Sequence, residues 1–193
     1  RNAQRILRLI NQLMDIRKLD KGQMFMKFQE TDMIGFIIDV MQPFEYMAHK
    51  KNIDFAFIHD MPQLKAWIDL NNFDKVLMNV LSNAFKYTPE GGNIMVYARM
   101  TDTYVEISVE DNGRGIAAKD LPAIFDRFFR ADASRNSSKG GSGIGLSIVR
   151  KIIEDHGGKI WANSKLGCGT VMYFVLRKYQ EVPVNEQNTN HRR

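Results

Sequence analysis

A cluster of glycines stands directly before an apolar helical pattern late in the chain, in the stretch KGGSGIGLSIVRKIIEDHGG (139–158). Gly141, Gly143 and Gly145 alternate there with small residues. Glycine costs roughly 0.5–1 kcal/mol against alanine in regular structure, so such a cluster needs a reason. One reason is a tight turn. The other is that a helix N-terminus exposes unpaired N–H groups and a positive dipole end, which attract phosphate.

A second polar set lies on a helix predicted over residues 72–87. Asn79, Asn83 and Lys86 are spaced so that they share one helix face, and Tyr87 follows. These groups could hold Mg²⁺ and phosphates, because Mg²⁺ prefers hard oxygen ligands. The alternative is a solvated polar face. The buried face of this helix is already supplied by Val76, Leu77, Val80, Leu81 and Ala84. Both asparagines therefore fall at the margin of the buried face, where a ligand pocket would need them.

A third candidate is DNGRGI (111–116), which follows a predicted strand directly. Its glycines let the chain turn sharply and approach a flat ligand closely. Asp111, at the strand end, offers a fixed hydrogen-bond acceptor. The alternative is an ordinary turn, for which Asp-Asn-Gly is also typical.

Several familiar phosphate-binding motifs are absent from the sequence. There is no G-x-x-x-x-G-K-[ST], so the chain is no P-loop protein. The dinucleotide-binding fingerprint needs a third glycine at position 146, which is Leu146. The H-R-D and D-F-G motifs of protein kinases are missing too. If these candidates bind phosphate, they belong to another class of phosphate-binding protein.

These residues must be positioned by mixed helices and strands. Periodicity predicts helices at 2–20, 31–51, 72–87, 117–124 and 143–157, with a polar loop at 131–143. Strands are predicted at 24–29, 53–58, 65–69, 159–164 and 169–176, and a hairpin at 93–111 that turns at Thr-Asp-Thr. Thr31 is the expected N-cap of its helix, and Pro43 an expected kink. We expect an α+β two-layer sandwich rather than a doubly wound parallel sheet.

Composition sets limits on the function. The 193 residues suit one domain with an appendage, and 44% hydrophobic with 25% charged residues is typical of globular proteins. The single cysteine, Cys168, excludes an internal disulfide and favours a reducing cytosol. No apolar run approaches the ~20 residues of a membrane span, so no membrane contact is predicted. The net charge is +5, but no basic block with interleaved aromatics favours nucleic acid.

Taken together, these stretches resemble the ATP-binding domain of sensor histidine kinases, in the family shared with gyrase B, Hsp90 and MutL. The matching motifs occur in the family's order and are NVLSNAFKYTPEGG (79–92), DNGRGI (111–116), FDRFFR (125–130), GSGIGL (141–146) and GCGT (167–170). The resemblance covers residues 24–178, and residues 9–24 resemble the second helix of the dimerisation hairpin. It implies a partial hairpin at 1–22, an ATP-binding catalytic domain at 23–178, and a linker or disordered tail at 179–193.

The resemblance assigns roles to individual residues. Asn83 would bind Mg²⁺ through its amide oxygen, with Asn79 nearby, and Lys86 would contact phosphate. Asp111 would accept a hydrogen bond from the adenine amino group, and Arg130 would point at the γ-phosphate. Among the other nucleotide-binding positions that it implies, Tyr87 would pack near the nucleotide, Gly115 would lie close to the adenine ring, and Thr170 would join through water. Gly141, Gly143 and Gly145 would let the chain approach the phosphates. The remaining implied positions are Gly113, Ile116 and Leu146.

Two features depart from the family pattern. ATP-hydrolysing relatives carry a glutamate one helical turn before the magnesium asparagine, but this position is Asn79, and a neutral amide cannot act as a general base. Family members also carry a phosphoacceptor histidine on the first helix of the hairpin. The four histidines here, His49, His59, His156 and His191, lack that setting, and His156 is expected to cap a helix end. We therefore expect a piece of a longer protein that begins inside the hairpin.

The resemblance implies the ATP-binding catalytic portion of a two-component sensor histidine kinase. It would bind Mg·ATP and transfer the γ-phosphoryl to a histidine on the dimerisation helix of the same or the sister subunit. The phosphoryl group would then pass to an aspartate of a response-regulator receiver domain. The full-length protein would be a homodimer, and this portion the cytoplasmic part of a membrane-bound sensor. The alternatives are a conformational ATPase clamp of the gyrase, Hsp90 and MutL type, against which Asn79 argues, and an interaction module with an inactive pocket.

Overall fold

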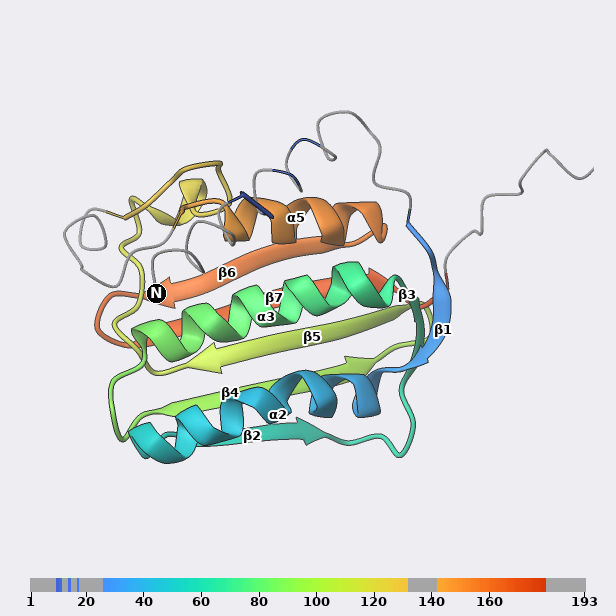
Figure 1. Cartoon of the computed structure of the whole chain (residues 1–193), viewed down its shortest axis with the longest axis horizontal. Helices are drawn as coiled ribbons and strands as arrows, with labels where there is room; N and C mark the ends of the chain where they lie inside the picture. The colour runs from blue at the N-terminus through green and yellow to red at the C-terminus, as the bar shows by residue number, and fades with distance from the viewer. Residues whose placement is uncertain (1–9, 12–13, 15–16, 18–25, 132–141, 180–193) are drawn as a thin grey trace, which may run out of the picture.

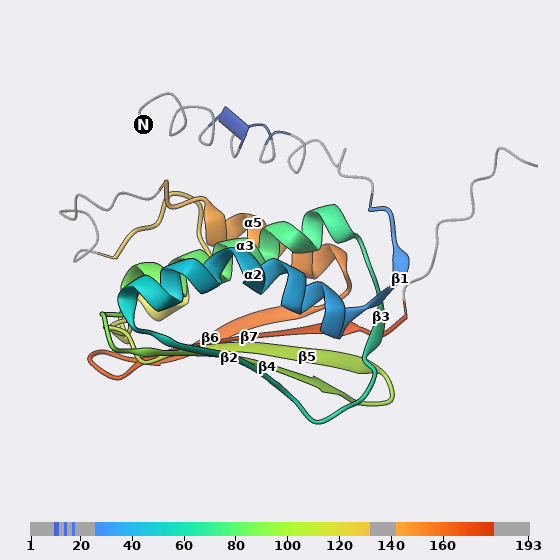
Figure 2. The same cartoon turned by 60° about the horizontal axis from the view of Figure 1, so that its bottom comes forward.

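The computed structural model describes residues 10, 11, 14, 17, 26–131 and 142–179, and most of them form two layers. Figure 1 shows the helices α2 (Met33–Lys51), α3 (Leu70–Tyr87) and α5 (Gly145–Asp155) side by side over a five-stranded sheet. Figure 2 shows that all three lie on the same face of that sheet. This arrangement confirms the predicted α+β two-layer sandwich.

The sheet is mixed and has the order β2-β4-β5-β7-β6. Its strands are β2 (Asp54–His59), β4 (Asn93–Met100), β5 (Tyr104–Asp111), β6 (Lys159–Lys165) and β7 (Gly169–Arg177). β2 and β4 run parallel, and the other neighbours run antiparallel. β4 and β5 form the predicted hairpin. The short strands β1 (Gln29–Asp32) and β3 (Lys65–Ile68) pair separately with each other.

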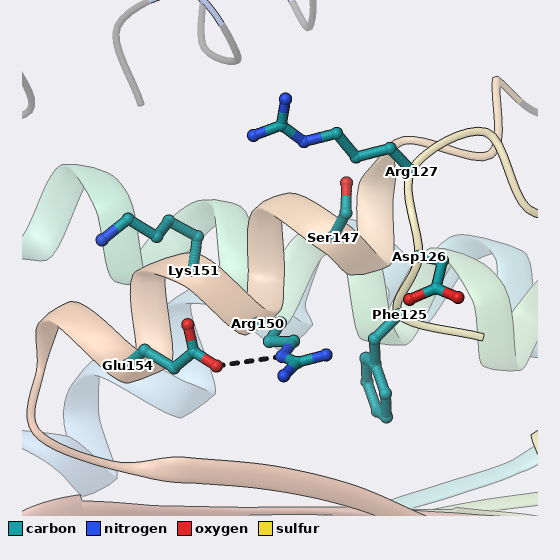
Figure 3. A pocket seen from close by; sticks show the side chains of 7 residues that line it. All are labelled: Phe125, Asp126, Arg127, Ser147, Arg150, Lys151 and Glu154. Atoms are coloured by element: carbon teal, nitrogen blue, oxygen red, sulfur yellow. Dashed lines mark hydrogen bonds and ion pairs between the residues drawn. The ribbon is translucent and has the colours of Figure 1, made fainter. Parts of the chain in front are cut away.

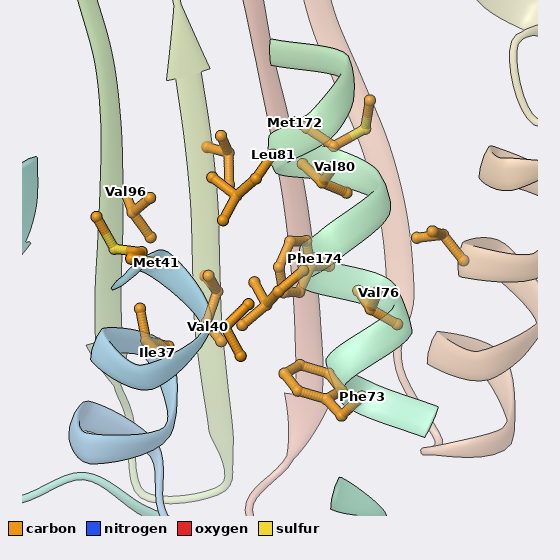
Figure 4. Packing of buried hydrophobic residues seen from close by; sticks show 14 of the residues in the cluster. Ile37, Val40, Met41, Phe73, Val76, Val80, Leu81, Val96, Met172 and Phe174 are labelled. Atoms are coloured by element: carbon orange, nitrogen blue, oxygen red, sulfur yellow. The ribbon is translucent and has the colours of Figure 1, made fainter. Parts of the chain in front are cut away.

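The hydrophobic core lies between the helices and the sheet, and α3 supplies its centre. The α3 side chains in Figure 4 are at most 3% exposed, and they are Phe73, Val76, Val80 and Leu81. They share the core with Ile37, Val40 and Met41 of α2 and with Val96, Met172 and Phe174 of the sheet. Burying one such side chain stabilises the fold by about 1.5–3 kcal/mol. The polar residues on the other edge of α3 are therefore held on a firmly packed element.

The helices differ in how they begin. The side chain of Asp32 accepts a hydrogen bond from the N–H of Ile34 and caps α2. Asp69 caps α3 in the same way, through the N–H of Asn72 at 3.0 Å. α5 begins without a side-chain cap. Because an unpaired first turn is costly unless water or a ligand satisfies it, the start of α5 stands apart from the other two.

Three local predictions are wrong. Thr31 is not an N-cap but lies in β1, and Asp32 caps α2 instead. Of the strand predicted at 24–29, residues 24–25 lie outside the described residues, residues 26–28 are not strand, and β1 begins at Gln29; the N–H of Lys27 donates instead to the Asp69 carboxylate at 2.7 Å. The helix predicted at 117–124 is a 3₁₀ turn at Leu121–Ala123. Pro43 lies inside α2, which continues past it.

His156 joins the end of α5 to the start of α3. Its side chain is fully buried, with Nδ1 donating to the carbonyl of Ile152 at 2.7 Å and Nε2 accepting the N–H of Asp69 at 3.1 Å. Burial lowers the pKa of His156, although the Ile152 hydrogen bond and the charges of Asp69 and Asp155 act in the opposite direction. A neutral ring makes both bonds. The expected role at a helix end is confirmed, since His156 is the C-cap of α5.

The helix predicted at 2–20 falls mostly outside the described residues. The four described positions, 10, 11, 14 and 17, have helical backbone. Ile10 and Met14, from its apolar stripe, are each 48% exposed. In the described part of the chain, no helix combines the length and the apolarity that crossing a membrane requires.

Candidate functional site

The predicted site residues gather at one end of the sheet, on the left in Figure 1. β5 ends there at Asp111, β7 begins there at Gly169, and α3 ends there at Tyr87. The backbone N–H of Arg114 donates to the Tyr87 carbonyl at 3.3 Å, which joins the loop after β5 to the end of α3. Segments far apart in the sequence thus meet at this end.

α5 begins beside the middle of α3. It ends at His156 next to Asp69, and its first residue, Gly145, lies so close to Asn79 that a Cβ there would stand 2.6 Å from the Asn79 Oδ1. The two helices therefore run antiparallel. α3 continues about two turns past the start of α5. That uncovered stretch carries Asn83.

The two asparagines of α3 have different environments. Asn79 donates from its amide nitrogen to the carbonyl of Lys75 at 2.8 Å, so its amide oxygen faces the start of α5. Asn83 is half-buried, and its side chain makes no hydrogen bond to any described residue. A half-buried side-chain amide without a partner among the described residues is well suited to a ligand.

Two cations lie against the ring of Tyr87. The Lys86 Nζ is 4.8 Å from the ring centroid, and the Arg114 guanidinium carbon is 4.3 Å from it. In this structure Lys86 therefore contacts its aromatic neighbour. Arg114 was not among the predicted site residues, although its place inside DNGRGI was a signal that could have found it. Together these groups give the end of α3 a positive surface that suits phosphate.

The carboxyl group of Asp111 is partly buried and held by backbone N–H groups. Its Oδ1 accepts from the N–H of Gly113 at 2.9 Å. Burial raises the pKa of Asp111 above its ordinary value, while the backbone hydrogen bonds from Gly113 and Thr170 lower it and the charge of Glu110 raises it. The carboxylate is thus fixed in direction, with acceptor capacity remaining for a ligand donor.

The glycines after Asp111 allow close packing. A Cβ on Gly113 would stand 2.6 Å from the Tyr87 carbonyl oxygen. Gly115 has a φ of +70° and approaches the carbonyl of Lys165 so closely that no side chain fits. The loop is therefore clamped between the end of α3 and the turn from β6 to β7.

Ser164 is a residue that sequence reasoning missed. Its Oγ accepts from the N–H of Ile116 at 2.8 Å, donates to the carbonyl of Gly169 at 2.7 Å, and lies 2.8 Å from the Oγ1 of Thr170. It links the Asp111 loop to the turn before β7. Its position opposite Thr170 in the predicted pair of closing strands was the available signal.

The glycines before α5 pack against the FDRFFR segment. Gly143 has a φ of +71°, and its carbonyl accepts from the N–H of Phe128 at 2.9 Å. Leu146 is half-buried against the core, and Arg130 is half-buried as well. Gly141 lies outside the described residues. The uncapped first turn of α5 and the Asn79 oxygen thus face each other across a glycine.

The residues at this end fit a nucleotide-bound Mg²⁺ ion. Within the described residues, no group of three His, Cys, Asp or Glu side chains could hold a metal by itself. Asn83 could supply one hard oxygen ligand, from the same helix face as Asn79. Mg²⁺ is usually bound by one or two protein ligands, with phosphates and waters completing its octahedron.

Two hollows elsewhere on the described surface contain none of the predicted site residues. One, of about 250 Å³, lies between the FDRFFR segment and the outer face of α5 (Figure 3). The Arg150 side chain on its wall is paired with Glu154 at 2.9 Å. The other, of about 500 Å³, lies at the end of α2, next to Gly91 and Gly92. The candidate site lies outside both hollows, at the end where α3 finishes and α5 begins without a cap, which we call the open end.

Comparison with known proteins identifies the class. Residues 68–180 match the family described as histidine kinase-, DNA gyrase B-, and HSP90-like ATPases. The chain belongs to this family. Within it, the chain carries the catalytic ATP-binding domain of two-component sensor histidine kinases.

Individual relatives agree with this assignment. The sensor histidine kinase WalK of Bacillus subtilis (strain 168) is 35% identical over 183 residues, which are 93% of this chain and 30% of WalK. The solved catalytic domain of histidine kinase ThkA is 36% identical with a TM-score of 0.72, covering 80% of this chain and 100% of that domain. ThkA in complex with the response regulator protein TrrA is 31% identical with a TM-score of 0.71, covering 90% and 49%. Full-length ShkA in complex with AMPPNP is 26% identical with a TM-score of 0.81, covering 93% and 37%.

Proposed function

We propose that this chain binds Mg·ATP at the open end of α3 and α5 and transfers the γ-phosphoryl group to a histidine on a dimerisation helix. The observation that carries the proposal is the start of α5. Its uncapped N–H groups face the amide oxygen of Asn79 across Gly145 and lie one turn of α3 from Asn83, whose side chain bonds to no described residue. Such an arrangement binds an anion and its metal counter-ion together.

Each group has a part in the proposed site. Asn83 would hold the metal, which neutralises charge on the phosphates when bound. Lys86 and Arg130 would contact phosphate oxygens, with Lys86 leaving the ring of Tyr87 to do so. Asp111 would accept from the adenine amino group. Catalysis would then consist of positioning and charge neutralisation, as in other phosphoryl transfers.

The remaining assignments follow from the packing of the loops. Gly113, Gly115 and Ile116 would line the base, and Thr170 would reach it through water. Gly143, Gly145 and Leu146 would bring the first turn of α5 to the phosphates, together with Gly141 from the preceding segment. We propose residues 23–178 as the extent of this catalytic domain.

Asn79 favours a kinase over a conformational ATPase clamp. Its amide nitrogen donates to the Lys75 carbonyl, and its oxygen faces the first turn of α5, where the phosphates would lie. An amide in this place cannot take a proton from water, so the γ-phosphoryl is spared from hydrolysis. A histidine acceptor on another helix would then be the preferred nucleophile.

Partners are proposed from the relatives. The chain spans about 30% of the length of WalK. ShkA was solved with AMPPNP and ThkA with a response regulator, which supports ATP and a receiver domain as partners here. We also propose a homodimer that supplies the histidine helix from the same or the sister subunit, and a cytoplasmic location where ATP is available.

Binding calorimetry with ATP and GTP, with and without Mg²⁺, tests the proposal. We expect the chain to prefer ATP and to need Mg²⁺ for full affinity. Asp111→Asn should weaken ATP binding by about 1.5–3 kcal/mol, because a charge-assisted hydrogen bond is lost. Equal affinity for ATP and GTP in the parent chain would contradict the assignment of Asp111.

A second experiment separates the kinase from the clamp. A supplied helix with a phosphoacceptor histidine should be labelled from γ-labelled ATP, while the chain alone should hydrolyse ATP slowly. Asn79→Glu should raise hydrolysis, since a general base contributes about 10²–10⁴-fold. Rapid hydrolysis by the unmodified chain, or labelling of its own histidines, would favour the clamp.

A further inference from the structure

We infer that Ser164 is a positioning residue for recognition of the base: it fixes the Thr170 hydroxyl so that Thr170, like Asp111, presents only hydrogen-bond acceptors. The inference rests on the proposed function and deepens it, since it identifies what distinguishes a purine with an amino group from one with a carbonyl. Nothing in the sequence motifs assigns a role to Ser164.

Three side chains form one row across neighbouring strands. Asp111 of β5 is paired with Thr170 of β7, and Thr170 is paired with Ser164 of β6. Directly paired residues project from the same face of a sheet. Val109 and Met172 lie two positions away from this row on β5 and β7 and therefore point to the same face. Both are buried beneath the helices, so the row lies on the helix-covered face at the open end. The Thr170 N–H also donates to the Asp111 carboxylate.

The hydrogen bonds of Ser164 leave one arrangement of protons. A serine hydroxyl has one proton and two lone pairs. The proton goes to the Gly169 carbonyl at 2.7 Å, because a carbonyl can only accept. The Ile116 N–H at 2.8 Å takes one lone pair. Thr170 Oγ1, at 2.8 Å, can then only donate to the remaining lone pair.

Thr170 therefore has no proton to offer a ligand. Its hydroxyl proton is committed to Ser164, and its own lone pairs remain. The Asp111 carboxylate is an acceptor as well. A ligand edge meets acceptors only when it reaches this row directly, or through one water that donates its two protons to Thr170 and Asp111. An exocyclic amino group satisfies them, whereas a carbonyl oxygen leaves acceptors facing each other.

The test compares ATP and GTP affinity by calorimetry in Ser164→Ala, Thr170→Val and the double variant. Ser164→Ala releases the Thr170 proton, so the hydroxyl can turn and donate to a carbonyl. We expect the ratio of ATP to GTP affinity to fall about 2- to 10-fold, which is one neutral hydrogen bond. Ser164→Thr keeps the hydroxyl and should restore the ratio of the parent.

The double variant separates positioning from simple support of the loop. Support of the loop through Ile116 would weaken both nucleotides equally and leave the ratio unchanged, which would overturn the inference. The inference would also be overturned if Ser164→Ala lowered the ratio of ATP to GTP affinity as much in the Thr170→Val background as in the parent, since no hydroxyl remains there to be turned.

If Ser164→Ala does not fold, Thr170→Val decides alone. A lower ratio of ATP to GTP affinity in Thr170→Val supports the inference, and an unchanged ratio contradicts it. If the parent chain does not prefer ATP to GTP, the proposed function itself is overturned. If the parent prefers ATP and Ser164→Ala has the same ratio of ATP to GTP affinity, only the role of Ser164 is overturned.

Discussion

The two ends of the α3–α5 pair are built in opposite ways. At the closed end, where α3 begins and α5 finishes, His156 bonds both helices, and Asp69 accepts from the N–H groups of Asn72 and Lys27. At the open end, α5 begins without a cap and Asn83 makes no hydrogen bond to a described residue.

The two ends differ in whether their polar groups are paired with other groups of the protein. Buried polar groups are nearly always paired, because an unpaired one costs about 1–3 kcal/mol. The closed end follows this rule, because both ring nitrogens of His156 are paired while its ring lies against the rings of Phe28 and Phe73. The open end leaves its groups for a ligand. Stability and binding should therefore respond to changes at different ends.

The largest effect is expected from Asn83→Ala at the open end. Loss of the metal ligand should reduce Mg²⁺-dependent ATP binding on the order of 100-fold, because charge neutralisation by a metal contributes several kcal/mol. Stability should change little, since the amide has no partner to lose. Calorimetry and thermal unfolding measure the two. Asn71→Ala, at an exposed asparagine of the same helix, is the control and should bind as the parent does.

Gly158→Ala should have the largest effect at the closed end. A Cβ there would collide with the backbone carbonyl of Val175 and stand 3.1 Å from Ile153, and neither can move freely. We expect a loss of about 1–3 kcal/mol in the free energy of unfolding, measured by urea denaturation. ATP affinity of the folded fraction should be retained. A variant as stable as the parent but weaker in binding would reverse the roles assigned to the two ends.

The closed end should also make stability depend on pH. The pKa of His156 is lowered in the folded chain, so between that pKa and about 6.5 the unfolded chain binds one more proton. The free energy of unfolding should therefore fall as pH drops below about 6.5, by up to about 1.4 kcal/mol per unit, and level off above. Urea denaturation from about pH 5.5 to 7.5 tests this. His156→Gln should remove the extra slope; an unchanged slope in that variant would refute the assignment.

Gly145→Ala is the matched glycine change at the open end and should have the smallest effect. Its Cβ meets only the Asn79 Oδ1, the tip of a side chain that can rotate. Stability should stay within about 0.5 kcal/mol, as for ordinary surface changes. ATP affinity should fall a few-fold, because the amide oxygen is displaced and the first turn of α5 is partly covered. An affinity equal to that of the parent would mean that the phosphates do not approach this turn.

The sequence allowed most of the open end to be predicted, because glycines, asparagines and Asp111 recur in motifs with fixed spacing. The hairpin and the sandwich followed from period-two and helical patterns. The errors lie where a distant residue decides local structure. Lys27 leaves the strand pattern because Asp69, 42 positions away, takes its N–H. Thr31 and Asp32 are both good caps by type, and Asp32 is the cap because β1 extends through both residues and α2 begins only at Met33. Ser164 carries no motif and needed the register of β6 with β7.

β1 and the residue after β7 are both bonded to β3, at the same end of the domain. β1 pairs with β3, and the N–H of Trp67 in β3 donates to the carbonyl of Lys178 just after β7, so both stretches are fastened together at the end opposite Asp111 (Figure 1). β5, with 8 residues, reaches from near that end to Asp111 and spans roughly 26 Å. A rotation of the domain by about 10° about that end would carry Asp111 by about 4–5 Å over this length.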